Sequence, residues 1–287
     1  MTMKKIIILS ILTVALATLY SCNNNGGTTS IVKSEKEVTD STLCQFRNIK
    51  VNKMFACRDE DRDSLYFDNN FSALWPEVIN GKPCTELQQA LLRAMTDSAE
   101  LNQLNLAIDC LLDPSNYTEY DRKDLVPVKN VKHDENKLST SEINVRMESM
   151  TDRLLTYHLG TYSYMAGGAH GIYANNYVNY DLKTEKAVTF SDVIADTTLL
   201  RNVTLKSIKQ TYDYDKDDLF IPDNGLLPLP NDFYIEGNVL HVVYQVYEIA
   251  SYAQGMIDAP IYPYMLKPEE MKRLFTPYGL ELIDYTE

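Results

Sequence analysis

Positive charge is scarce in this chain of 287 residues. Lysine and arginine together number 27 against 40 aspartate and glutamate residues, so the net charge at pH 7 is −13. Recognition of nucleic acid requires a basic face that neutralises phosphates. The composition therefore argues against a nucleic-acid partner. It favours a basic partner, or else simply keeps an exported protein soluble.

The signature motifs of common enzymes are also lacking. The chain contains no G-x-S-x-G nucleophile elbow, no H-E-x-x-H zinc motif and no phosphate-binding loop. Its later cysteines include no C-x-x-C pair, which argues against structural zinc. We therefore expect no metal and no cofactor, and composition alone reveals no chemistry.

The N-terminus has the features of an export signal. The apolar run Ile6–Leu19 follows Lys4 and Lys5 and is too short to span a bilayer comfortably, so residues 1–21 are predicted to be a cleaved signal peptide. The run ends in Leu-Tyr-Ser-Cys, which resembles a bacterial lipobox, and Cys22 is then the lipid-attachment residue. The alternative is cleavage nearby by an ordinary signal peptidase. Several acyl chains on one cysteine suffice for stable anchoring, so we expect membrane contact through the lipid only.

Processing changes the charge and the thiol count. Loss of residues 1–21 removes two lysines, which leaves a charge of −15 on the mature chain. We expect a lipid-anchored protein at the outer membrane or periplasmic face of a Gram-negative-type bacterium. The oxidising envelope permits disulfides, in any of three pairings, and free buried thiols are the alternative. The four thiols concerned are Cys44, Cys57, Cys84 and Cys110.

Composition divides the mature chain into a tether and two modules. Residues 22–42 are rich in Asn, Gly, Thr and Ser and predict a flexible tether. Residues 43–135 predict an N-terminal α+β companion module. It begins with strand-like alternation over 46–55, followed by helical spacing over 85–112, with Thr85 and Gln88 as a capping box and a bend near Asp97. The polar stretch 126–141 predicts a linker or long loop.

Residues 142–287 predict a second α+β domain. Alternation indicates strands near 143–147 and over 172–181, with a polar turn at 183–186. Helices are expected from Ser191 through Ile194, over 199–212 and from Pro268, and a hairpin over 233–247. The acidic stretch 213–218 breaks a helix; a solvated loop is the main interpretation and a calcium loop the alternative. The fold class is therefore α+β, with antiparallel sheets packed with helices in two small modules.

An ordered set of segments carries a family resemblance. The segments are Tyr164–Gly171, Asn179–Thr184, Val188–Ile194, Phe233–Tyr234 and Tyr247–Gly255. Together they resemble the envelope domain at the C-terminus of RsiV-type anti-sigma factors, which also accompanies some peptidoglycan deacetylases. The preceding region resembles the uncharacterised module that usually stands before that domain.

The resemblance implies a fold and a capacity to bind. In RsiV-type members the extracellular region is a sensor that binds lysozyme, and binding exposes the anti-sigma factor to proteolysis. This chain has a lipobox in place of the transmembrane helix and no sigma-binding segment, so that signalling route does not carry over. The separate catalytic domain of the deacetylases is not found either. The resemblance therefore implies recognition of a protein or a glycan.

The glycine motif around His170 allows two interpretations. In one, His170 is a general base or metal ligand, with His158, His241, Asp181 and Glu248 as further candidates. In the other, three glycines permit unusual backbone conformations, and the imidazole of His170 ties the turn through hydrogen bonds.

Tyrosine is the more informative residue, with 20 copies against 8 phenylalanines. Rigid rings with a polar tip suit protein interfaces and sugar stacking, whereas the alternative is partly buried strand tyrosines. The candidate binding residues are Tyr162, Tyr164, His170, Tyr173, Tyr177, Tyr247 and Tyr252.

The leading interpretation is a non-enzymatic envelope lipoprotein that binds a protein, such as a basic lysozyme-like protein, or a peptidoglycan fragment. One alternative is a peptidoglycan or glycan hydrolase or deacetylase that uses His170. Another is a structural subunit of an envelope complex.

Overall fold

The computed structural model describes residues 43–59, 62–129 and 135–285. The chain divides into two compact units by its internal contacts: unit 1 is Met1–Val145 with Gly160–Tyr173, and unit 2 is Arg146–Leu159 with Ala174–Glu287. The predicted signal peptide, Cys22 and the tether lie outside the described residues and stay predictions. The module boundaries expected from composition also stay predictions.

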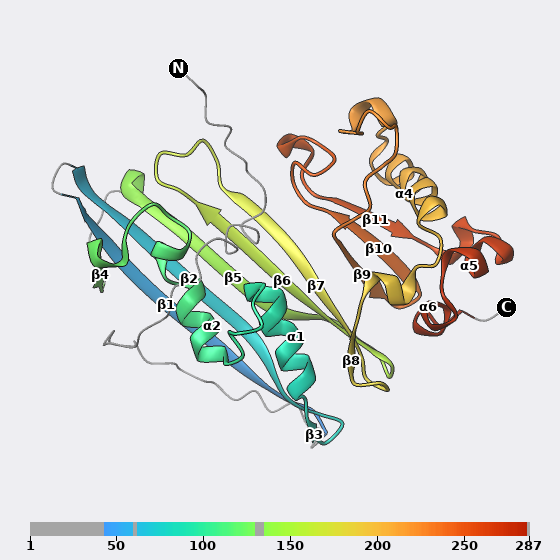
Figure 1. The fold of residues 1–287 in the computed structure, drawn as a ribbon, viewed down its shortest axis with the longest axis horizontal. Coiled ribbons are helices and arrows are strands. Elements are labelled where there is room, and N and C mark those ends of the chain that lie inside the picture. Colours follow the sequence, from blue (N-terminus) through green and yellow to red (C-terminus); the bar gives the residue numbers. More distant parts are fainter. Residues whose placement is uncertain (1–42, 60–61, 130–134, 286–287) are drawn as a thin grey trace. The chain divides into compact units, whose positions relative to one another are not determined.

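The described residues form two sheets and six α-helices, which confirms the α+β class (Figure 1). One sheet has the strand order β4-β1-β2-β5-β6-β7-β8, with β3 paired to β2, and the other has the order β11-β10-β9. The strands of the first sheet are β1 Gln45–Asp59, β2 Arg62–Ile79, β3 Lys82–Pro83, β4 Leu125–Val128, β5 Leu138–Met150, β6 Leu154–Tyr164, β7 Ile172–Asp181 and β8 Lys186–Val188.

The long hairpin of β1 and β2 forms the centre of unit 1. The two strands pair antiparallel, with Val51 opposite Phe71, and β4 adds to the other edge of β1. Strand β5 pairs parallel to β2, with Phe71 opposite Ile143. The expected linker over 126–141 is therefore wrong at both ends, because Val126–Val128 belong to β4 and 138–141 begin β5. The charged residues Lys129, Glu135 and Lys137 of this stretch follow β4 or precede β5.

Two helices cover one face of this hairpin, α1 Thr85–Thr96 and α2 Leu104–Leu111 (Figure 1). The bend expected near Asp97 is confirmed, since α1 ends there with Asp97 in the left-handed region at φ 49°. The capping box is wrong. The N-cap is Cys84, and the Gln88 side chain donates from Nε2 to the carbonyl of Pro76 at 2.7 Å instead of capping its own helix.

Among the described residues, no disulfide joins Cys44, Cys57, Cys84 or Cys110, so the alternative without disulfides describes the structure, with Cys57 and Cys84 buried and the other two half-buried. Cys57 is buried with Phe55, Phe67 and Leu125 in an apolar cluster. Burial raises the pKa of Cys84 to about 11, which keeps this thiol protonated at neutral pH and unreactive.

Unit 2 packs α4 Thr197–Tyr212 against one face of the sheet formed by β9 Asp232–Glu236, β10 Val239–Tyr244 and β11 Ile257–Ile261 (Figure 1). The Ser207 hydroxyl fixes this packing by donating to the carbonyl of Pro260 at 2.7 Å. Alternation places Ile235, Leu240 and Val242 in the core, because every second strand residue faces the helix.

Short helices complete unit 2: α3 Phe190–Val193, α5 Pro268–Leu274 and α6 Pro277–Leu282. The expected hairpin and the helix from Pro268 are confirmed, although α6 follows that helix. Ser191 is not the cap of α3. Thr189 is, in a capping box with Asp192.

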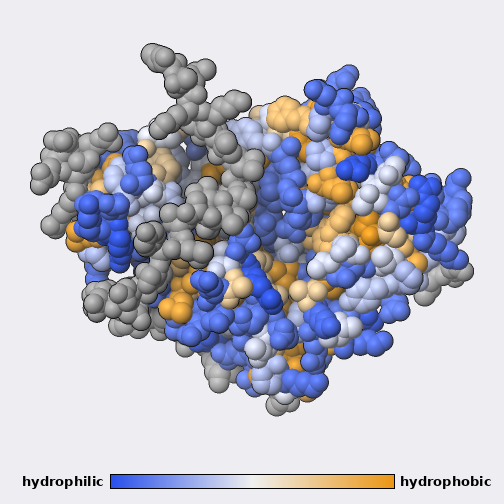
Figure 2. All heavy atoms as spheres, viewed as in Figure 1, coloured by the Kyte–Doolittle hydropathy of each residue, from blue (hydrophilic) through white to orange (hydrophobic). Residues whose placement is uncertain are grey.

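The acidic stretch after α4 has a local explanation. Asp213 ends α4 in the left-handed region, and Lys209 contacts the carboxylates of both Asp213 and Asp215, at 2.8 and 3.1 Å. The face drawn in Figure 2 is mainly hydrophilic, with hydrophobic side chains in separate patches. Among the described residues, every helix falls short of the length and apolarity that crossing a bilayer requires.

Candidate functional site

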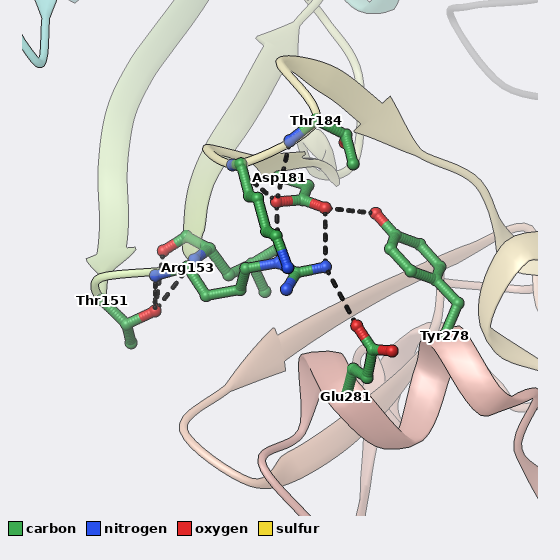
Figure 3. Close-up of polar contacts among 8 residues, drawn as sticks. Thr151, Arg153, Asp181, Thr184, Tyr278 and Glu281 are labelled. Carbon is green, nitrogen blue, oxygen red and sulfur yellow. Dashed lines mark hydrogen bonds and ion pairs between the residues drawn. The ribbon is translucent and has the colours of Figure 1, made fainter.

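Asp181 is the centre of a buried ion-pair cluster in unit 2 (Figure 3). It ends β7 and is fully inaccessible to solvent. Arg153 contacts both carboxylate oxygens, from Nε to Oδ1 at 2.8 Å and from Nη2 to Oδ2 at 3.1 Å. The Tyr278 hydroxyl of α6 donates to Oδ2 at 2.7 Å, and the backbone N–H of Lys183 donates to Oδ1 at 2.8 Å.

This cluster holds its carboxylate in the ionised form. Burial of Asp181 acts to raise its pKa, but the bonds from Tyr278, Lys183 and Arg153 outweigh that effect, and the net pKa lies below the usual value. A bidentate guanidinium with three further donors, the Tyr278 hydroxyl and the backbone N–H groups of Lys183 and Thr184, leaves the carboxylate no capacity for substrate. Asp181 therefore ties the β7–β8 turn to the 151–153 turn and to α6. The geometry of Asp181 does not suit the catalytic role that the sequence suggested for it beside His170.

The opposite face of the three-stranded sheet carries a row of four rings, which we call the ring stack; three are stacked and the fourth, His158, is tilted by 58° to its neighbour. His158 of β6 lies against Tyr177 of β7, with centroids 5.1 Å apart. Tyr177 stacks on Tyr234 at 4.3 Å, and Tyr234 stacks on His241 at 4.2 Å. The last pair is possible because Tyr234 and His241 are direct cross-strand partners in β9 and β10.

The two ends of the stack differ in accessibility. His158 is buried, and its Nδ1 has no hydrogen-bond partner among the described residues. Burial lowers the pKa of His158 and Arg146 lowers it further, which favours the neutral ring. At the other end, Asp258 Oδ1 lies 2.9 Å from His241 Nδ1, and Asp258 Oδ2 accepts from the Tyr234 hydroxyl at 2.8 Å. The Asp258 side chain is 35% exposed, so only this end meets solvent.

A polar network fixes the start of the β10–β11 loop. The side-chain amide of Gln245 pairs with the backbone of Asn175, accepting at 3.0 Å and donating at 2.6 Å. Glu248 accepts from the backbone N–H of Gln245 at 2.8 Å and from Asn231 Nδ2 at 3.0 Å. Loss of water from around the Glu248 carboxylate raises its pKa. The loop is therefore tied to β7 and to the residue before β9.

Asp232 lies beside this network. Its carboxylate accepts from the backbone N–H groups of Tyr177 and Phe233, both at 2.7 Å. Removal from water raises the pKa of Asp232 to about 7, against the effect of both backbone bonds and with a further contribution from Glu248. The group can thus exchange a proton near neutral pH.

Tyr247 protrudes from this fixed loop. Its backbone has a φ of 66°, a region that costs a non-glycine residue about 1–2 kcal/mol. The Tyr247 side chain is nevertheless exposed, at 41%, and its ring lies 5.5 Å from that of Tyr252. Ser251 and Gln254 close the following turn as a capping box. The two tyrosines that the sequence proposed in this segment are therefore together.

The glycine motif forms an exposed turn between β6 and β7, in unit 1. Gly167 adopts a φ of 79°, and a Cβ on Gly171 would overlap the ring of Tyr162. His170 is exposed and its Nδ1 donates to the carbonyl of Gly171 at 2.8 Å. Tyr164 is the last residue of β6, and Tyr173 is the second residue of β7.

The structure groups the proposed binding residues into three places. Tyr162, Tyr164, His170 and Tyr173 belong to the β6–β7 hairpin end in unit 1, Tyr177 belongs to the ring stack, and Tyr247 with Tyr252 belongs to the β10–β11 loop. Their functional roles stay predictions. Sequence reasoning missed the pairing of His241 with Asp258. It depends on strand register, with His241 opposite Pro260, and no spacing in the sequence signals it.

Part of unit 2 matches a known protein family. Residues 177–262, from the ring stack to the end of β11, match the family described as protein of unknown function (DUF3298). No curated protein matches the chain. The RsiV-type assignment itself stays a prediction.

Two solved structures share the fold. A DUF3298 family member from Bacteroides fragilis NCTC 9343 is 17% identical, with a TM-score of 0.53, over 83% of this chain and 95% of that one. A DUF3298 family protein from Pseudomonas aeruginosa PAO1 is 15% identical, with a TM-score of 0.50, over 83% of this chain and 98% of that one.

Proposed function

We propose that this protein is a lipid-anchored component of a bacterial cell envelope that binds a protein or a cell-wall glycan. The observation that carries the proposal is the β10–β11 loop, in which Tyr247 is held in a strained conformation with its ring exposed. Strained residues persist where the surrounding structure imposes them, and they cluster at functional sites. Here the Glu248 and Gln245 bonds impose the conformation.

The chemistry of the loop suits recognition. Tyrosine offers a large, rigid, amphipathic surface with few torsions to immobilise, and such rings contribute to protein interfaces and sugar stacking alike. The sequence resemblance to RsiV-type sensors supports a lysozyme-like protein as one partner. The acidic chain supports the same choice through long-range attraction.

The test uses the full-length lipidated protein in detergent. It is passed over immobilised lysozyme and over insoluble peptidoglycan, at low and at high salt, beside the Tyr247→Ala variant. We expect retention on at least one ligand, reduced by the substitution. Screening predicts that retention on lysozyme falls as salt rises. No retention of the native protein on either ligand at low salt would contradict the proposal.

Anchoring is tested separately. Cys22→Ser is expected to abolish labelling by a radioactive fatty acid and to move the protein from the membrane to the soluble envelope fraction. A Cys44→Ser variant is the matched control and is expected to label normally. Unchanged labelling of Cys22→Ser would show that lipidation at Cys22 is wrong.

A further inference from the structure

Two loops of unit 2 meet beside Tyr247. One runs over 213–227, after α4, and the other over 245–255, after β10. The backbone N–H of Phe220 donates to the carbonyl of Ile249 at 2.7 Å, and Gln254 Nε2 donates to the carbonyl of Asp218 at 3.2 Å. We call residues 213–227 and 245–255 the two-loop surface.

Buried residues alternate with exposed rings along both loops. Leu219 and Ile249 are in the core, whereas their near neighbours Phe220 and Tyr247 are 54% and 41% exposed. The core contacts fix the backbone on either side of each ring. Single exposed rings are common on protein surfaces, but these two belong to loops that hydrogen bonds join to each other.

The charge of the first loop is predominantly negative. Five aspartates and one lysine occupy residues 213–223. Lys209 contacts Asp213 and Asp215. The carboxylates of Asp217 and Asp223 belong to exposed residues on either side of Phe220.

We propose that the two-loop surface binds an arginine- or lysine-rich segment of a partner protein. The guanidinium or ammonium groups would lie over the rings of Phe220 and Tyr247, where cation–π attraction is available, and pair with Asp217 and Asp223. Charge complementarity favours a cationic segment over a neutral glycan, because a neutral glycan would contact the rings but would not pair with the aspartates. This inference rests on the proposed binding function and names the site and the partner's chemistry.

The test titrates the full-length protein with an octa-arginine peptide by calorimetry, at two salt concentrations. Phe220→Ala and Tyr247→Ala are each expected to weaken binding about tenfold, as loss of a ring anchor does. The double variant Asp217→Asn, Asp223→Asn is expected to weaken it roughly threefold at low salt and to reduce the salt dependence. Circular dichroism and thermal melts check that the variants fold.

Matched controls separate a site from general charge. Glu119→Gln with Glu269→Gln removes the same two charges from exposed positions outside the loops, and Tyr264→Ala removes an 81% exposed ring elsewhere in unit 2. Both are expected to change affinity by less than about twofold. Equal losses in the controls and in the loop variants would overturn the proposal.

The same variants distinguish this inference from the proposed function. If lysozyme or peptidoglycan is retained while octa-arginine does not bind, the cationic occupant is wrong and the binding function stands. Binding of a neutral chitin hexamer that is weakened by Tyr247→Ala and unaffected by the two Asp→Asn changes would overturn the inference in favour of a glycan. Loss of every ligand would contradict both.

Discussion

The Asp181 cluster and the two-loop surface use the same residue types in opposite ways. In the first, a tyrosine hydroxyl and an arginine saturate a carboxylate that has no exposed surface. In the second, aromatic rings and aspartates face solvent beside a core that fixes their backbone. Polar residues with all of their bonds made inside the chain stabilise the fold, and polar residues that the fold presents outward are available to a partner.

Removal of the Asp181 carboxylate should produce the largest effect on stability. Asp181→Ala leaves Arg153 partly buried without its main partner, and breaking such a pair costs about 3 kcal/mol. Urea denaturation is expected to show this loss in the free energy of unfolding. Octa-arginine binding to the folded fraction should be unchanged. Weaker binding at full folding would show that the two regions are coupled.

The pH dependence of stability should separate Asp181 from Asp232. The lowered pKa of Asp181 contributes stability that is present above the unfolded value of about 3.9 and is lost as pH falls through the folded value. The raised pKa of Asp232 contributes stability that is complete below about 3.9 and is lost as pH rises through about 7.

Asp232→Asn tests the expected loss of stability with rising pH. The variant is expected to lose the decline in unfolding free energy between about pH 4 and pH 7 that Asp232 contributes. Urea denaturation at half-unit intervals of pH measures it. An unaltered slope would show that Asp232 is ionised throughout the range in the folded protein.

Removal of the Tyr278 hydroxyl should lower the free energy of unfolding less than removal of the Asp181 carboxylate does. Tyr278→Phe removes one of the donors to Asp181 and keeps the ring, so we expect a loss of about 1 kcal/mol. Tyr285→Phe, in the same C-terminal segment, is the control for removal of a hydroxyl. Equal losses in both variants would remove the special role given to the Asp181 cluster.

Tyr247→Gly, unlike the substitutions in the Asp181 cluster, should raise the stability of the protein. Glycine accepts a φ of 66° without steric cost, so the unfolding free energy is expected to rise by up to about 1 kcal/mol. Binding should weaken at the same time, because the ring is gone. A stabilised variant that binds normally would show that the strain at Tyr247 does not serve recognition.

Local patterns predicted much of unit 2. Period-two alternation and the turn at Gly237 indicated the β9–β10 hairpin, and Pro268 with its acidic neighbours indicated α5. Capping was less predictable. Thr85 and Gln88 fit a capping box in sequence, but Gln88 finds a better acceptor in the carbonyl of Pro76, a tertiary contact that no local window contains.

The candidate site was predictable only in part. The tyrosines of the segment 247–255 were identified from residue type and family resemblance, and their rings do lie together. Phe220 was missed because a single ring in an acidic loop carries no periodic signal. Its loop meets the loop of Tyr247 through a backbone bond to Ile249, which is 29 residues along the chain. Strand register likewise decides the contact between His241 and Asp258.

Hydrogen–deuterium exchange of the full-length protein with and without bound lysozyme tests the central claim most directly. We expect slower exchange in peptides covering 213–227 and 245–255, and no change in those covering the Asp181 cluster at 151–154 and 181–184. Protection confined to other segments, such as the β6–β7 hairpin end at 162–173, would contradict the assignment of binding to the two-loop surface.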